Sequence, residues 1–173
     1  MTTDSPSSKA SDGRPSESLK SLGIEDLDCL EDLLSFYVRS VNYALSVDLD
    51  ARLENLEVAR GTGKITALLL IDSHPGIRPS AIAQATLRDR PSVSRIVGHM
   101  LKNGLVEKVE SPDERRASGL YITDAGHELA ETVRGIVKQQ SKDFFVDVPK
   151  EDRDELLRIT KSIYKKIIEA RTP

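Results

Sequence analysis

The sequence predicts a mainly α-helical protein that carries one small β-hairpin. Apolar residues recur at the three- and four-residue spacing of a helix over most of the chain after residue 18. Only two short segments, 105–110 and 119–123, alternate apolar and polar side chains as strands do. Aromatic residues make up 4% of the chain and Trp is absent, which fits a helical core better than a sheet.

The composition indicates one globular domain with an N-terminal tail. The chain has 173 residues, 38% of them hydrophobic, which is enough to bury a core. Residues 1–18 are rich in Ser, Pro, Asp and Gly, and we expect them to form a flexible tail before a single domain over 19–173. No apolar run approaches a membrane span or a signal sequence, so we expect a cytoplasmic protein without a membrane partner.

The usual signatures of catalysis and metal binding are missing from the sequence. Cys29 is the only cysteine, and the three histidines at 74, 99 and 127 have no metal-ligand spacing. The Gly63-Lys64 pair suggests a phosphate-binding loop, but that motif needs Gly and Ser or Thr where Val58 and Ile65 stand. No nucleophile–base pair or paired carboxylate motif is present. We therefore expect no enzyme, no metal and no cofactor.

A long helix is expected near the N-terminus. Between Ile24 and Leu53 one apolar stripe steps by three or four residues through Leu30, Leu34, Tyr37, Val41 and Leu45. The apolar band is wider than one core needs, which favours a second copy of the chain as partner. The alternative, that this helix only spans its own domain, stays open.

Two short helices follow the loop around Gly61 and Gly63 and the apolar block 65–71. They cover 79–85 and 91–101 and are separated by the basic turn 88–90. Pro91 suits a first helical turn, and Asn103-Gly104 is typical of a helix C-terminus.

A β-hairpin and two further helices complete the chain. The segments 105–110 and 119–123 flank a charged tip at 111–116, which predicts the hairpin. The Thr123 hydroxyl can cap a helix that extends to about residue 142. After a break at 144–149, the last helix has one apolar face formed by Leu156, Ile159, Ile163 and Ile167.

Two short helices, a tight turn and a hairpin with a basic tip form the plan of a winged helix-turn-helix, which reads double-stranded DNA. Residues 78–116 hold eight Lys and Arg against five Asp and Glu, a net charge of +3, whereas the rest of the chain carries −6. The second helix would lie in the major groove and the hairpin arginines in the adjacent minor groove. The expected DNA-binding residues are Ser80, Arg88, Arg90, Ser92, Ser94, Arg95, His99, Lys102, Arg115 and Arg116.

The segment 77–126, IRPSAIAQATLRDRPSVSRIVGHMLKNGLVEKVESPDERRASGLYITDAG, resembles the MarR (multiple antibiotic resistance regulator) family of bacterial transcription factors. The resemblance implies a winged helix-turn-helix over 62–123 and dimerisation helices over 24–56 and 124–171. It also implies a homodimer that reads a short palindrome, with repression relieved by a small-molecule ligand.

The wing departs from the family pattern at one position. The family has an Asp followed two residues later by Arg, and counting back from Thr123 places Glu114 and Arg116 on that pair. Asp113 with Arg115 is the alternative pair, so both arginines remain candidates.

The ligand is not identified by the sequence. In a peroxide-sensing branch of the family a reactive cysteine precedes Phe in the first helix, but here Ser35 precedes Phe36. Cys29 has acidic rather than basic neighbours, which does not favour a reactive thiolate. The family expectation is a pocket between the dimerisation helices and the winged domain. Its candidate lining residues are Tyr37, Arg39, Tyr43 and His74.

We therefore expect a homodimeric, DNA-binding repressor of palindromic operators that is released by a small molecule. The alternative is a winged-helix protein-interaction module without specific DNA binding. It is supported by the acidic total charge and by Glu114 in the wing.

Overall fold

The computed structural model describes residues 21, 23, 26–59, 61–110 and 118–171. The expected tail at 1–18 and the hairpin arginines Arg115 and Arg116 lie outside these residues. The elements are η1 (Asp28–Leu30), α2 (Leu34–Arg52), α3 (Thr62–Ser73), α4 (Pro79–Thr86), α5 (Arg90–Lys102), β1 (Val106–Glu110), β2 (Ser118–Ile122), α6 (Asp124–Phe144) and α7 (Lys150–Arg171). Within the described part of the chain, every helix is too short or too polar to span a lipid bilayer.

The chain forms two compact units, 1–44 and 45–173, with the boundary inside α2. The prediction that a helix begins near Ile24 is wrong, because regular helix in the first unit begins only at Leu34. Asp28 has a φ of 50°, and its N–H donates to Asp26 Oδ1 at 3.0 Å. Acidic side chains compete in this way with helical backbone bonds, so the segment forms the short 3₁₀ turn η1 instead.

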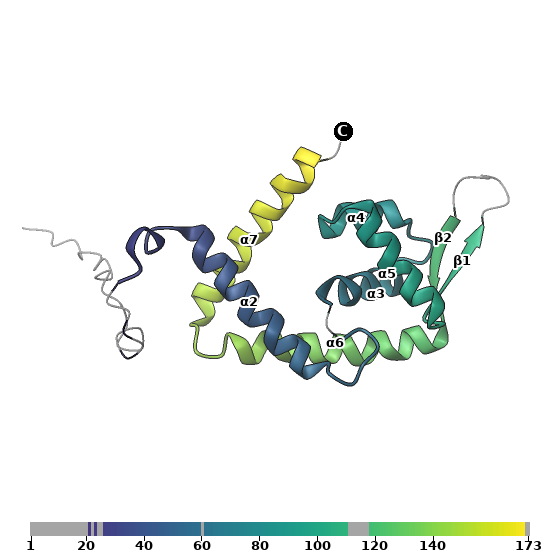
Figure 1. Ribbon diagram of the computed structural model, residues 1–173, viewed down its shortest axis with the longest axis horizontal. Helices are drawn as coiled ribbons and strands as arrows, with labels where there is room; N and C mark the ends of the chain where they lie inside the picture. Colours follow the sequence, from purple (N-terminus) through teal and green to yellow (C-terminus); the bar gives the residue numbers. More distant parts are fainter. Residues whose placement is uncertain (1–20, 22, 24–25, 60, 111–117, 172–173) are drawn as a thin grey trace, which may run out of the picture. The chain divides into compact units, whose positions relative to one another are not determined.

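The second unit has its core among α3, α4, α5, α6 and the hairpin, which pack together at one end of α6 (Figure 1). α3 supplies the centre, since Leu68 and Ile71 are fully buried, and Ile82 and Met100 close over them from α4 and α5. The mainly α fold with a small hairpin is thus confirmed.

The helix-turn-helix begins and ends on local signals. Pro79 and Pro91 lie in the first turns of α4 and α5, where a missing N–H loses no partner. α4 ends at Thr86, and its C-cap Leu87 has a φ of 56° that reverses the chain. Gly104, with a φ of 66°, follows the end of α5. Gly63, expected in a loop, instead lies in the first turn of α3.

The hairpin has the expected position. β1 and β2 are antiparallel, with Val106 opposite Ile122 and Glu110 opposite Ser118. Beyond the strands, Ile77 pairs with Leu120, so the segment before α4 is joined to the hairpin. Leu105, Val106 and Leu120 are buried, which seats the hairpin on the core.

Thr123 caps α6 and fixes its start. Its Oγ1 accepts the N–H of Gly126 at 3.1 Å and donates to the Gly104 carbonyl at 2.7 Å. The Thr123 N–H also donates to the Leu105 carbonyl at 3.1 Å. The start of α6 is therefore hydrogen-bonded to the segment between α5 and β1.

α6 follows the hairpin, and α7 follows the C-terminal end of α6. Gln140 of α6 is buried and donates to the Leu45 carbonyl at 2.7 Å, and Arg52 donates to Asp143 at 2.8 Å. α7 also contacts α4, because the Tyr164 hydroxyl donates to the Ala85 carbonyl at 2.8 Å.

The close approach of α6 to Leu105 makes Gly126 a test of this packing. A Cβ at position 126 would lie 2.0 Å from the Leu105 carbonyl oxygen, so backbone must move. We expect Gly126→Ala to lower the free energy of unfolding by about 3 kcal/mol in denaturant titration.

Gly135→Ala in the same helix is the matched control, because a Cβ there meets nothing within 4 Å. It should stabilise the protein by about 0.5–1 kcal/mol, since Ala restricts the unfolded chain. Equal effects of the two substitutions would contradict the packing described here.

Candidate nucleic-acid interface

The N-terminal ends of α4 and α5 meet around a shallow surface hollow. Pro79 and Ser80 line it from α4, and Arg90 and Ser94 line it from α5. Three residues expected to bind DNA are thereby brought together. Two hydroxyls and one guanidinium line this surface, which suits a phosphate group because hydroxyl donors and a positive charge bind phosphate oxygens.

Ser92 and Arg95, also expected to bind DNA, are joined to the cap of α5. The Asp89 carboxylate accepts the Ser92 N–H at 2.6 Å and the Ser92 hydroxyl at 2.9 Å. Arg95 Nη2 donates to Ser92 Oγ at 3.3 Å. The hydrogen bonds from Ser92 hold the pKa of Asp89 below its ordinary value, so its carboxylate is ionised at neutral pH. Sequence reasoning missed Asp89, although an Asp before Arg-Pro is a typical helix cap.

His99 and Arg88 have protein partners near the expected reading surface. His99 Nε2 lies 3.3 Å from the Glu57 carbonyl oxygen, and Asn103 donates to the Glu57 carboxylate at 3.2 Å. The segment before α3 therefore contacts the C-terminal half of α5, where Lys102 remains exposed. The Arg88 guanidinium lies over Gly63, since a Cβ there would be 2.8 Å from Arg88 Cζ.

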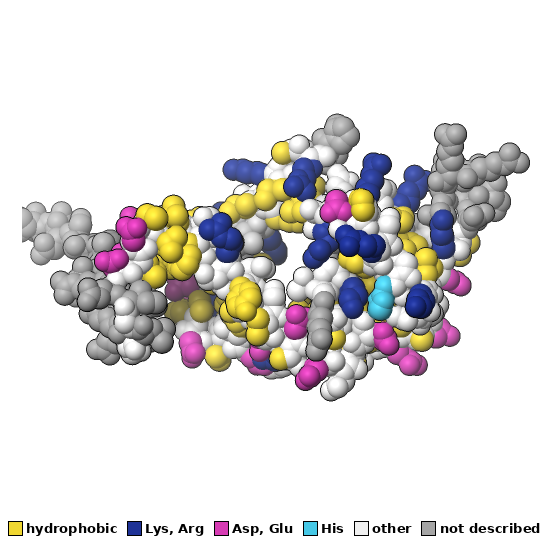
Figure 2. Space-filling model, in the orientation of Figure 1, with side chains coloured by type: hydrophobic (Ala, Val, Ile, Leu, Met, Phe, Trp, Pro, Cys, Tyr) yellow, Lys and Arg dark blue, Asp and Glu magenta, His cyan; other side chains and the backbone are white. Residues whose placement is uncertain are grey.

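Charge is distributed unevenly over the second unit. In Figure 2 the Lys and Arg side chains gather over the region of α4 and α5, and Asp and Glu side chains lie along the side of α6. A surface of this kind attracts a polyanion to one face and keeps it from the other.

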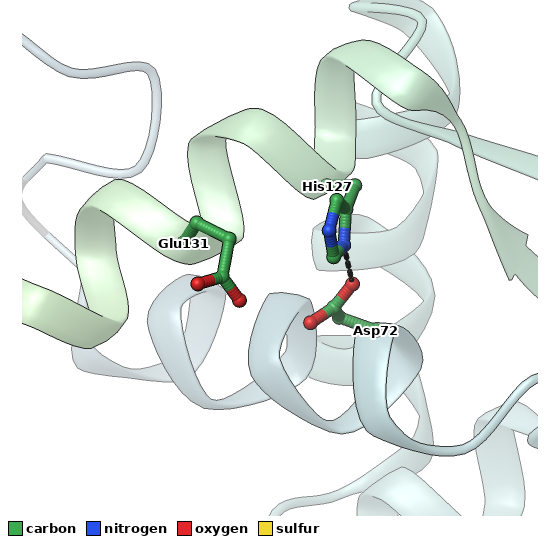
Figure 3. A group of neighbouring side chains, drawn as sticks. All are labelled: Asp72, His127 and Glu131. Atoms are coloured by element: carbon green, nitrogen blue, oxygen red, sulfur yellow. Dashed lines mark hydrogen bonds and ion pairs between the residues drawn. The ribbon is translucent and has the colours of Figure 1, made fainter.

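An ion-pair cluster joins α3 to α6 (Figure 3). The Asp72 side chain is only 6% exposed; His127 Nδ1 lies 2.6 Å from its Oδ1, and Arg134 Nη2 lies 2.5 Å from its Oδ2. Arg134 also pairs with Glu131. Sequence reasoning missed this cluster; its signal was Asp72 as the one charged residue between Ile65 and Ser73.

The cluster is an ion-pair network rather than a cation site. Asp72, His127 and Glu131 each offer one ligand atom, all within 4.8 Å of one another. Arg134, however, bonds both carboxylates and already supplies the positive charge that a metal ion would bring. Burial acts to raise the pKa of Asp72, but hydrogen bonds from Arg134 and His127 outweigh it and lower that pKa.

The four residues expected around a ligand are not brought together by any described contact. Tyr37, Arg39 and Tyr43 are exposed on the part of α2 in the first unit. His74 ends α3, with Nδ1 3.2 Å from the Leu70 carbonyl oxygen. A different, mainly apolar hollow lies between α3 and α6 and is lined by Leu49, Thr62, Ile65, Thr66, Leu69, Leu70, Ser73, Arg134 and Val137.

The fold is that of a winged helix-turn-helix protein. Residues 61–117 match the model of the MarR family. A Thauera aromatica protein, named as a transcriptional regulatory protein for the hcr operon, is 30% identical over 98 residues, 57% of this chain and 59% of that protein. The Escherichia coli K12 transcriptional repressor MprA is 26% identical over 103 residues, 58% of either protein. The matched segment thus spans less than two thirds of each relative.

Solved structures show the same fold. A MarR-family regulator from Listeria monocytogenes, crystallised with a 26-mer DNA, has a TM-score of 0.72 at 19% identity and covers 80% of this chain and 91% of its own. The transcriptional repressor CouR, bound to a 23-mer duplex, has a TM-score of 0.72 at 23% identity, covering 80% and 96%. The expected resemblance to the MarR family is confirmed for residues 61–117. The relatives are named as transcriptional regulators, which agrees with the expectation that the chain is not an enzyme.

The Asp72–His127 contact makes stability depend on pH. The hydrogen bond to Asp72 raises the pKa of His127 above its ordinary value. Its stabilising effect is complete below the unfolded pKa, about 6.5, and is lost as pH rises through the higher folded pKa. The free energy of unfolding of the wild type should therefore exceed that of His127→Gln most clearly between about pH 5 and 6, and the difference should shrink as the pH rises further.

The same comparison in an Asp72→Asn background separates this contact from any other effect of His127. There the pH-dependent difference should vanish, because the partner carboxylate is gone. A difference that persists in that background would show that another group raises the pKa of His127.

Proposed function

We propose that this protein is a DNA-binding transcriptional regulator in which α5 is the recognition helix. The observation that carries the proposal is the surface at the N-termini of α4 and α5, where Ser80, Arg90 and Ser94 line one hollow. In the same part of α5, Arg95 is exposed and donates to Ser92. Phosphate groups would bind around the hollow and fix the protein on the duplex. Arg95 would then pair with guanine in the major groove.

The remaining expected contacts take supporting roles in this proposal. Lys102 and Arg88 would contribute positive charge around the reading surface. His99 would support α5 through Glu57 more than it reads bases, because its ring is already held there. Arg115 and Arg116 would follow the adjacent minor groove from the tip of the wing.

The active form in this proposal is a homodimer that represses transcription from palindromic operators. On α7 a row of large apolar side chains is left exposed in the single chain, as Leu157 at 53% and Ile163 at 48% illustrate. In the first unit Leu34 and Val38 of α2 are 72% and 58% exposed. Exposed apolar surface of this extent favours burial against a second copy. Two recognition helices would then read half-sites about one helical turn, roughly 34 Å, apart.

A small molecule would relieve repression by binding better to a form with misplaced recognition helices. Among the described residues, the apolar hollow between α3 and α6 suits such a ligand best, because its lining residues come from both the winged helix and α6. Tyr37, Arg39, Tyr43 and His74 remain the sequence-based prediction for such a pocket.

The test of the proposal is selection of duplexes from a random DNA pool, with the mass of the retained complex measured. A palindromic consensus bound by two chains is expected. Failure to retain any duplex at low salt would instead favour a protein-interaction module.

Arg95→Ala then tests the recognition helix on the selected operator. We expect operator affinity to fall by roughly tenfold to a hundredfold, because a bidentate arginine–guanine pair is lost. Binding to random duplex should change far less, since only one cation is removed.

Lys138→Ala is the matched control, because it also removes one exposed positive charge but from α6. It should leave the ratio of operator to random-duplex affinity unchanged. Operator affinity that is unchanged in Arg95→Ala would contradict the assignment of α5.

A further inference from the structure

Both carboxylate oxygens of Asp89 accept hydrogen bonds from Ser92. Oδ1 accepts the Ser92 N–H at 2.6 Å, which is the ordinary bond of a helix cap. Oδ2 accepts the Ser92 hydroxyl at 2.9 Å. Capping needs only the first of these bonds. The bond to the Ser92 hydroxyl is therefore not explained by capping.

The second bond fixes the direction in which the Ser92 hydroxyl points. A hydroxyl has one proton to donate, and in Ser92 it goes to Asp89, which leaves the oxygen lone pairs facing other donors. Arg95 Nη2 lies 3.3 Å from that oxygen and donates to it. Hydrogen bonds therefore run in one order, from Arg95 to Ser92 to Asp89.

Arg95 keeps most of its donors in this arrangement. A guanidinium group has five N–H bonds, and the contact with Ser92 uses one. The others remain for the two acceptors of guanine. An arginine that is already held loses less conformational freedom on binding than one that moves freely in solvent.

We propose that Asp89 is a positioning residue for DNA reading, which holds Arg95 through Ser92 in the orientation that pairs with a base. This inference rests on the proposed function, because it assumes that α5 enters the major groove. It assigns to an acidic residue, which repels DNA phosphates, a positive contribution to sequence specificity.

Asp89→Asn separates positioning from capping. Asn caps a helix about as well as Asp, so the bond to the Ser92 N–H is kept. Its amide, however, presents a donor where Asp89 Oδ2 accepts, and the charge that attracts Arg95 is lost. Ser92→Ala instead removes the hydroxyl that links Arg95 to Asp89.

The experiment measures affinity for the selected operator, for every single-base variant of it and for random duplex, together with the melting temperature. We expect Asp89→Asn and Ser92→Ala to reduce discrimination, roughly tenfold, at the same base pair that Arg95→Ala affects. Discrimination at the other base pairs and the melting temperature of Asp89→Asn should stay close to wild type. Random-duplex affinity should be equal or higher, since a negative charge is removed.

Two comparisons complete the design. In the double variant Asp89→Asn/Arg95→Ala the base profile should equal that of Arg95→Ala alone, because Asp89 acts only through Arg95. Asp152→Asn, in the first turn of α7, removes an equivalent acidic charge away from α5 and should leave the profile unchanged.

A wild-type base profile in Asp89→Asn would overturn the inference and leave Asp89 as a cap only. Loss of discrimination spread evenly over the operator would also overturn it, because a general loosening of α5 has that effect. Absence of any preferred duplex for the wild-type protein would instead reject the proposed function itself.

Discussion

The orientation of α5 about its own axis is set by the burial of Val93, Val97 and Met100. These side chains are 1%, 6% and 0% exposed, and they pack into the core formed by α3, α4 and the hairpin. An amphipathic helix held by one face cannot turn without bringing polar groups into that core. Ser94 and Arg95 must therefore face outward, and the surface available to DNA follows from the packing beneath it.

Contacts at both ends of α5 also fix its position along the helix axis. Asp89 begins the helix and Gly104 follows its end, while Glu57 contacts His99 near the C-terminal end. Arg90, Ser94 and Arg95 are exposed in its first two turns. Asp72 joins α3 to His127 and Arg134 of α6, so ion pairs hold the winged helix to the helix that follows the hairpin. The same buried carboxylate links the stability of this joint to pH.

Much of this architecture was predictable because its signals are local. The periodicity of 91–101, the alternation around Val106 and Leu120 and the cap at Thr123 each fix an element within a few residues of sequence. The start of α2 was not predictable in this way. The apolar spacing typical of a helix already begins before Leu34, but Asp26 and Asp28 lie in that segment and favour a turn. In the site, Ser80, Arg90 and Ser94 were expected and do meet. Asp72 with His127 lies 55 residues away in sequence, and no single-sequence pattern brings such a pair together.

Guanine methylation interference on the selected operator tests the central claim, that two copies of α5 read the major groove, most directly. Methylation of guanine N7 blocks the major-groove edge at the atom that an arginine pairs with. The account predicts two clusters of interfering guanines about 10 base pairs apart, related by the symmetry of the operator. Interference by methylated adenine N3 in the minor groove without interference by guanine N7, or a single cluster of guanines, would contradict it.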